Sequence, residues 1–294
     1  MSTSRKEKEM DKELKIAILI DADNISDKYV KIILDETATK GVATYKRIYG
    51  DWTSTKLGSW KKVLLENSII PIQQYSYTTG KNATDSAMII DAMDILYSGT
   101  VDGFCIASSD SDFTRLVARL RESGMYVLGM GESKTPLPFV SACNEFKYLD
   151  LLLNAILKEE KEQAASVKEL ETAVSEKKKA LDTSPTAALK TKKQAKEIKE
   201  SPGSRNTLSL KKFKKEVRSI AESCSDDDGW IFSGELRNQL AKRFPDFDVR
   251  NFGHSKFTPF MESLGIFDVR REATTAGNRV KLVYFRCRSC SDVS

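Results

Sequence analysis

Short apolar runs alternate with stretches of helical periodicity over residues 14–162, and a different pattern begins after residue 206. In the first part, runs rich in β-branched and aromatic residues are separated by amphipathic segments, which is typical of a parallel sheet with crossover helices. The predicted strands are KIAILID (15–21), VATYKRIYGD (42–51), SIIPIQQYS (68–76), DGFCIASS (102–109) and MYVLGM (125–130). The predicted helices lie at about 26–39, 56–66, 85–98 and 112–123, and a short run FKYLD leads into a closing helix, LLNAILKEEKEQ. We therefore expect a three-layer α/β domain.

The pattern after residue 206 predicts a smaller α+β domain. LKKFKKEVRSIAESC and SGELRNQLAKRF have helical periodicity, and a third helix is expected within DFDVRNFGHSKFTPFMESLG. IFDVRRE and RVKLVYFR then have the composition of two strands. Three helices followed by a hairpin indicate a winged helix.

The chain of 294 residues, 40% of them hydrophobic, has room for two cores. A segment rich in Lys and Ala, without an aromatic residue, separates them and is expected to be a basic linker, because it offers little apolar surface to bury. The expected division is a charged tail (1–13), the α/β domain (14–162), the linker (163–206), the winged helix (207–288) and a short tail (289–294).

Charge and cysteine content suggest a cytoplasmic protein. No apolar run reaches eighteen residues, and the charged N-terminal segment lacks a signal-peptide hydrophobic stretch. Five scattered cysteines in a chain of ordinary composition argue against a disulfide scaffold. The net charge of +5 is a mild excess that suits a polyanionic partner without demanding one.

Acidic residues gather where the predicted strands end. In open parallel sheets, ligands bind beyond the carboxyl ends of the strands, so these positions are the place to look for chemistry. Any one acid there is also a good helix cap, but capping does not require two successive acids at two separate strand ends. The residues concerned are Asp21, Asp23 and Asn24 after the first strand, Ser109, Asp110 and Asp112 after the fourth, and Asp85 at the start of the third helix.

Several carboxylates brought together repel one another unless a cation neutralises them, and oxygen ligands favour Mg²⁺ or Mn²⁺. Such an ion suits phosphodiester hydrolysis, since it lowers the pKa of a bound water and stabilises charge on phosphate oxygens. His254 is the only histidine and lies outside this domain, so a Ser-His-Asp mechanism lacks a base.

Basic and aromatic residues on neighbouring loops are candidates for contacts with a single-stranded substrate. Lys56 follows the second strand and Lys81 follows the third, and lysines meet phosphates while aromatic rings stack on bases. Packing against neighbouring elements is the simpler expectation for Trp60 and Tyr75.

Three motifs of the first domain resemble the NYN domains of the PIN-like ribonuclease group, including the LabA-like bacterial proteins. They are ILIDADN, ATDSAMIIDAMD and IASSDSDFTRLVARLRESGMYVLGMG, and the resemblance covers roughly residues 14–150. It implies a PIN-like (Rossmann-like) fold and a catalytic metal site of Asp21, Asp85, Asp110 and Asp112, with Asp21 and Asp110 as the most direct ligands. Asp23, Asn24 and Ser109 would lie close by; the family often has Gly in place of Ser109.

The second domain resembles the OST-HTH domain, also called LOTUS, through GWI, the L-x-x-x-L-x-x-x-F helix, FDVRNFGHSKF and the final hairpin. The resemblance implies binding of G-rich or structured RNA, or of a protein partner as in some animal members. Candidate RNA contacts are Arg250, His254, Lys256 and Lys281, whereas Trp230, Phe252 and Phe257 are expected to pack in the core.

The sequence thus predicts a metal-dependent ribonuclease, of the endonuclease type, joined to an RNA-binding module. A non-catalytic RNA-binding regulator on the same scaffold is the alternative, and homodimerisation is left open. The D-x-D of Asp21 and Asp23 also occurs in haloacid dehalogenase phosphatases. That family places Thr or Val where this chain has Ile25, however, and its later lysine motif has no obvious match here.

Overall fold

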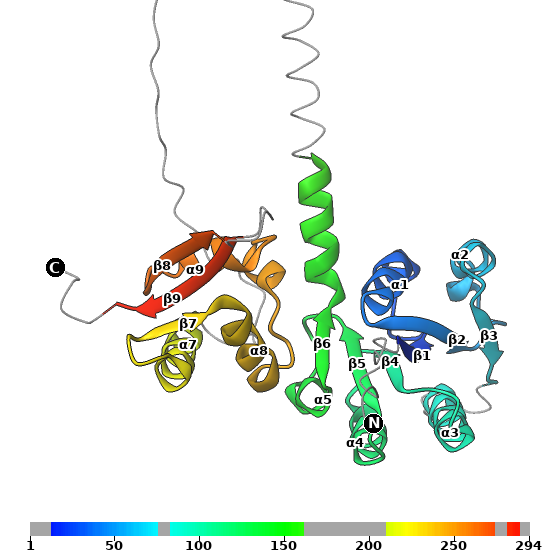
Figure 1. Ribbon diagram of the computed structural model, residues 1–294. Helices are drawn as coiled ribbons and strands as arrows, with labels where there is room; N and C mark the ends of the chain where they lie inside the picture. The colour runs from blue at the N-terminus through cyan, green and yellow to red at the C-terminus, as the bar shows by residue number, and fades with distance from the viewer. Residues whose placement is uncertain (1–12, 76–82, 162–209, 274–280, 289–294) are drawn as a thin grey trace, which may run out of the picture.

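The computed structural model describes residues 13–75, 83–161, 210–273 and 281–288, which form two domains (Figure 1). The expected linker at 163–206 and the tail at 289–294 lie outside these residues. Of the expected tail at 1–13, only residue 13 is described. Among the described helices, none combines the length and apolar composition needed to cross a membrane.

The N-terminal domain is built on a six-stranded parallel sheet in the order β3-β2-β1-β4-β5-β6. The strand order reverses between β1 and β4, the two strands at the centre of the sheet. The strands are β1 (Leu14–Asp21), β2 (Gly41–Gly50), β3 (Ile70–Gln73), β4 (Gly103–Ala107), β5 (Tyr126–Gly131) and β6 (Glu145–Tyr148).

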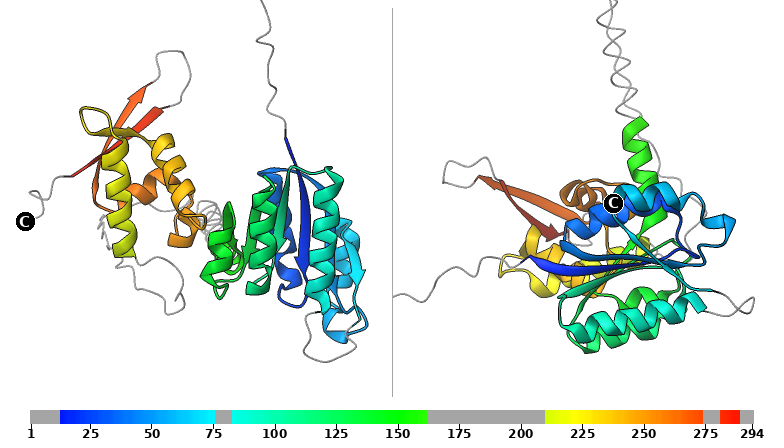
Figure 2. Two further views of the ribbon diagram at one scale, coloured as in Figure 1. Left: turned by 90° about the horizontal axis from the view of Figure 1, so that it is seen from below. Right: turned by 90° about the vertical axis from the view of Figure 1, so that its right-hand side faces the viewer.

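Helices cover both faces of this sheet, as Figure 2 shows. Along β1, Ile18 and Ile20 pack with α1, α2 and the closing helix, while Ala17 and Leu19 pack with α3, α4 and α5. Burial on both faces explains why β1 is a continuous apolar run instead of an alternating one. The helices are α1 (Val30–Ala38), α2 (Trp60–Asn67), α3 (Ala83–Ser98), α4 (Thr114–Glu122), α5 (Leu137–Ala142) and the closing helix, described over residues 149–161.

The predicted three-layer α/β domain is confirmed, with differences at the element ends. The predicted strand 68–76 shortens to β3, because Ser68 takes a left-handed conformation (φ 53°) directly after α2. Three predicted helices begin with a separate 3-10 turn: η1 (Asp27–Tyr29), η2 (Thr55–Leu57) and η3 (Ser111–Phe113). The six-residue α5 was not expected.

The C-terminal domain has the predicted winged-helix arrangement of three helices and a hairpin. Its antiparallel sheet has the order β7-β9-β8, and the short strand β7 adds to the expected hairpin. Phe213 lies at the centre of the core, where its ring contacts those of Phe244, Phe247, Phe252 and Phe260. The elements are α7 (Leu210–Cys224), β7 (Trp230–Phe232), α8 (Ser233–Arg243), η4 (Val249–Phe252), α9 (Phe257–Ser263), β8 (Phe267–Ala273) and β9 (Lys281–Cys287).

The two domains meet at β6, the edge strand of the large sheet (Figure 1). The backbone N–H of Phe146 donates to the carbonyl of Pro245 at 2.8 Å, so the edge strand is hydrogen-bonded to the second domain. Lys147, only 8% exposed, lies 2.7 Å from Asp248, and Tyr148 donates to Asp246 at 3.2 Å. Contacts from three successive residues of β6 therefore hold the second domain against the first.

Arginine and glutamate complete this contact. The Arg250 guanidinium binds both carboxylate oxygens of Glu36 on α1, at 2.6 and 3.0 Å, and also contacts Asp248 at 2.7 Å. Burial raises the pKa of Asp248, but hydrogen bonds and charge from Arg250 and Lys147 outweigh burial, and the pKa falls below its ordinary value. Asp248, Lys147 and Arg250 are therefore held in their charged forms.

Candidate metal centre

The candidate metal centre lies at the carboxyl ends of β1 and β4. Ile20 pairs with Ala107 across these parallel neighbours, so the residues that follow the two strands lie side by side. Asp21 ends β1 and Ser108 directly follows β4. Because the strand order reverses between these two strands, this is the crevice where ligands of open α/β sheets bind.

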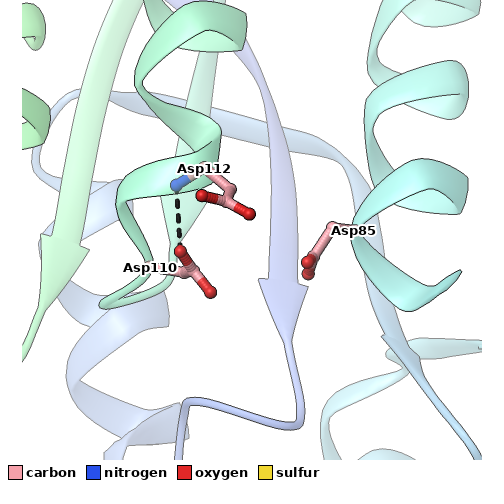
Figure 3. A group of neighbouring side chains, drawn as sticks. All are labelled: Asp85, Asp110 and Asp112. Carbon is pink, nitrogen blue, oxygen red and sulfur yellow. Dashed lines mark hydrogen bonds between the residues drawn. The ribbon is translucent and has the colours of Figure 1, made fainter. Parts of the chain in front are cut away.

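A 3-10 turn after β4 presents two of the acids. Asp110 caps this turn, and its carboxylate accepts a hydrogen bond of 2.9 Å from the backbone N–H of Asp112. Phe113 is fully buried and anchors the turn in the core. Asp85 approaches from the first turn of α3, so the three acids come from two separate elements (Figure 3). Carboxylate oxygens of Asp85, Asp110 and Asp112 all lie within 4.8 Å of one another.

Charge accumulates around Asp85. Burial raises its pKa to about 6, with further contributions from the negative charges of Asp21, Asp110, Asp112 and Asp23. Four other carboxylates therefore lie close enough to repel it. A divalent cation would relieve this repulsion, and the oxygen-only donors fit Mg²⁺ or Mn²⁺.

Asp21 lies beside these three acids in a network of its own. Its side chain is fully buried, which raises its pKa. It accepts hydrogen bonds from the Ser108 hydroxyl at 2.7 Å, from the Asn24 amide at 2.8 Å and from the Asp23 backbone N–H at 3.0 Å. The Ser108 hydroxyl also accepts from the backbone N–H of Asp110 at 3.0 Å. Ser108 thus links the two strand ends.

The predicted set of acids therefore divides into three that meet and one beside them. Asn24 lies at the site as expected, and Asp23 is exposed at its edge. Ser109 instead turns toward the end of β5, where its hydroxyl accepts from the backbone N–H of Glu132 at 2.9 Å. Ser108 was missing from the predicted site, although a hydroxyl residue between a buried strand and the first acid was a usable signal.

Family models match two parts of the chain. The model of the NYN domain matches residues 15–151, and that of the OST-HTH/LOTUS domain matches residues 208–278. The chain joins an NYN domain to an OST-HTH/LOTUS domain. The two resemblances that the motifs carry are thereby confirmed, and they support a ribonuclease or RNA-binding role. The phosphatase alternative gains no such support.

Two solved structures are similar to part of this chain. A protein of unknown function from Vibrio parahaemolyticus RIMD 2210633 is 20% identical, with a TM-score of 0.40; the match covers 47% of this chain and 94% of that one. An uncharacterized protein from Nitrosomonas europaea is 24% identical, with a TM-score of 0.26, over 35% of this chain and 93% of that one. TM-scores this low support no conclusion about this chain. No curated protein matches it.

The loops of the NYN domain contain part of the predicted substrate-binding set. Lys56 is exposed in the turn after β2, on the same edge of the sheet as the acids. Trp60 is buried in the core, as expected, whereas Tyr75 is 55% exposed, so the expectation that it packs was wrong. Lys81 lies outside the described residues.

The predicted RNA contacts of the LOTUS domain have different surroundings. Lys256 and Lys281 are exposed, and His254 is half-buried, with its ring 3.2 Å from the Ser263 hydroxyl. Arg250 is engaged with Glu36 and Asp248, so an RNA phosphate would have to compete with two carboxylates for it. Each of these RNA contacts stays a prediction.

Proposed function

We propose that the chain is a metal-dependent ribonuclease in which the NYN domain hydrolyses RNA phosphodiester bonds and the LOTUS domain binds the RNA. The observation that carries the proposal is the meeting of Asp85, Asp110 and Asp112 within 4.8 Å at the strand-order reversal. Exposed Lys56 and Tyr75 on adjacent loops suit the phosphates and bases of a single strand.

The acids and Ser108 would have separate roles at the metal site. Asp85, Asp110 and Asp112 would hold Mg²⁺ or Mn²⁺, and Asp21 would complete the site from β1. When bound, the ion supplies a water of lowered pKa and stabilises charge on the phosphate. Ser108 orients Asp21 and the Asp110 backbone together, and the η3 cap fixes the direction of the Asp110 carboxylate.

A test is incubation of the full chain with labelled single-stranded and G-rich RNA, with Mn²⁺ or Mg²⁺ or with EDTA. We expect metal-dependent cleavage, reduced by about 100-fold or more in the Asp110→Asn, Asp112→Asn double variant, since weakening even the outer supports of metal ligands typically costs 10 to 100-fold. Asp94→Asn is the matched control, because this acid is exposed on α3 and lies outside the group of three. Products from a circular single-stranded RNA would establish an internal cut.

A non-catalytic RNA-binding protein is the second candidate. It is favoured by one observation, the three internal hydrogen bonds that Asp21 already accepts. RNA that is bound and stays intact with either metal would decide for this candidate and against the ribonuclease.

A further inference from the structure

The outer face of the three-stranded LOTUS sheet brings aromatic rings and arginines together. Trp230 pairs with Arg286 across β7 and β9, Phe232 pairs with Tyr284, and Tyr284 pairs with Arg270 of β8. The intervening residues, such as Ile231 and Phe285, are buried in the core on the other face. We call the five residues Trp230, Phe232, Arg270, Tyr284 and Arg286 the sheet-face patch. Trp230 was expected to pack in the core; it lies on this outer face instead.

The side chains of the patch are arranged against one another. The Arg270 guanidinium lies 4.7 Å from the centre of the Trp230 ring and 5.1 Å from that of Tyr284, and Arg286 lies 4.7 Å from Trp230. The rings of Phe232 and Tyr284 are 5.7 Å apart. Stacking on the rings restrains the guanidinium groups, so less rotational freedom is lost when they bind a ligand.

The patch is open to solvent. Phe232 is 42% exposed, and Arg270 and Arg286 are exposed. Figure 2 (left) shows the β8–β9 hairpin on the side of the LOTUS domain away from the NYN domain. The contact between the domains therefore does not cover it.

Charge on this face favours an anionic ligand. Three arginines, the two of the patch and Arg288, face two carboxylates. Asp268 lies 3.4 Å from Arg286 and 2.9 Å from Arg288, and Glu272 lies 3.0 Å from Arg270. The side chains of these pairs are 41–49% exposed, and exposed ion pairs contribute little, so a phosphate can replace either carboxylate.

The opposite side of the LOTUS domain is engaged already. A cleft of about 700 Å³ between the domains is lined by Arg250, Lys256 and Phe257 on the LOTUS side, and by Glu36, Lys40 and Lys147 on the NYN side. Arg250 and Lys147 there are paired with carboxylates. Among the described residues of the LOTUS domain, the sheet-face patch combines exposed arginines with an exposed aromatic ring.

We propose that the sheet-face patch binds single-stranded RNA, with bases stacked on Phe232 and Tyr284 and phosphates bound by Arg270 and Arg286. The inference rests on the proposed function for its RNA ligand and adds to it the surface that binds. The exposed ring of Phe232 and the partly buried ring of Tyr284 can stack on any base, and arginines beside them meet the backbone, as on other surfaces for single strands.

The test is fluorescence anisotropy of labelled oligouridine with the full chain in EDTA, over a series of salt concentrations. For Arg270→Ala, Arg286→Ala we expect about 10-fold weaker binding or more and a salt slope reduced by about 1.4, from two phosphate contacts at roughly 0.7 each. For Phe232→Ala we expect about 5-fold weaker binding or more with an unchanged slope, because a stacked base is lost but no charge. Lys212→Ala, Lys215→Ala is the control, since it removes two exposed positive charges from α7 of the same domain.

The proposal is overturned if the patch variants bind oligouridine as tightly as the control variant does. That result is also the one expected if this face binds a protein partner instead of RNA. If wild type binds and cleaves RNA while the patch variants bind unchanged, only this inference fails. If wild type binds no RNA, the RNA-binding half of the proposed function fails with it. Loss of cleavage in Asp110→Asn, Asp112→Asn with binding intact concerns the NYN domain alone.

Discussion

Single residues of the candidate metal centre carry an electrostatic cost that a cation would remove. Asp85 is the clearest case, because burial and four neighbouring carboxylates disfavour its charge. We expect Asp85→Asn to raise the unfolding temperature of the metal-free protein, and a gain of about 1 kcal/mol would appear as roughly 2–4 °C in a chain of this size. Thermal unfolding in EDTA measures the change.

Adding Mn²⁺ supplies the complementary measurement. The wild type should gain thermal stability in Mn²⁺, by about 2.7 kcal/mol when the free ion is at 100 times its dissociation constant. Asp85→Asn should gain less, whereas Asp94→Asn should respond as wild type does. A metal-free Asp85→Asn protein less stable than wild type would contradict the expectation that the buried charge of Asp85 destabilises the metal-free site.

Gly131, the last residue of β5, is a residue whose missing side chain shapes the site. A Cβ there would lie 2.6 Å from the Ser108 carbonyl oxygen and 2.6 Å from the Thr135 hydroxyl. We expect Gly131→Ala to displace the Ser108 turn, to cost about 1–3 kcal/mol of unfolding free energy, and to lower RNA cleavage. Gly58→Ala is the control, because its Cβ would meet only the Thr55 carbonyl, at 3.3 Å. Chemical denaturation and cleavage assays on both variants decide; wild-type cleavage in Gly131→Ala would refute the expectation.

At the scale of elements, the position of α3 decides where Asp85 lies. Arg47 and Tyr49, both on β2, donate hydrogen bonds to the Asp91 carboxylate on α3. Asp91 is six residues beyond Asp85, or about 9 Å along the helix at 1.5 Å per residue. These two bonds therefore fasten the helix that presents Asp85 to the strand beside β1.

We expect Asp91→Ala to leave Arg47 and Tyr49 without this partner and to cost about 1–3 kcal/mol of unfolding free energy. The helix should also move enough to weaken Mn²⁺ binding, which titration of the ion into the folded protein measures. Asp94→Ala, an exposed acid on the same helix, should change neither quantity. Lost stability with unchanged Mn²⁺ affinity would limit Asp91 to a structural role.

Elements differ in how far the sequence predicts them. The apolar run of β1 was predictable, because a central strand buried on both faces has apolar residues on both sides. The acids after β1 and β4 were predictable from their positions directly after such runs. Strand β7, with three residues, and helix α5, with six, are too short for periodicity to distinguish them from loops. Ser108 was overlooked since its role depends on the alignment of two strands distant in sequence.

The contact between domains is the feature of the whole molecule that sequence patterns do not predict. Lys147 lies in a run that indicates only a short strand, and its partner Asp248 is 101 residues away. Arg250 is of a residue type expected to contact RNA, but its position relative to Glu36 depends on how the two folded domains pack. Long-range ion pairs of this kind follow from surface shape after each domain has formed.

The two domains should separate when the charge cluster between them is broken. Removing the Lys147 cation leaves Asp248 with Arg250 and Glu145 with Lys40 as their remaining cations. Losing one partner of a buried ion pair costs up to about 3–5 kcal/mol. We therefore expect Lys147→Met to increase the radius of gyration in small-angle X-ray scattering, while Lys134→Met, which removes an exposed lysine paired with Glu132, should not. The pKa of Asp248 is lowered, so its contribution is complete above the ordinary aspartate range and is lost only as pH falls below about 4. The pKa of Lys147 is raised, so its charge persists at higher pH. The Lys147–Asp248 pair of the wild type should thus stay charged between about pH 5 and 8. An unchanged radius in Lys147→Met would mean that the Phe146–Pro245 hydrogen bond and apolar packing suffice to hold the domains together.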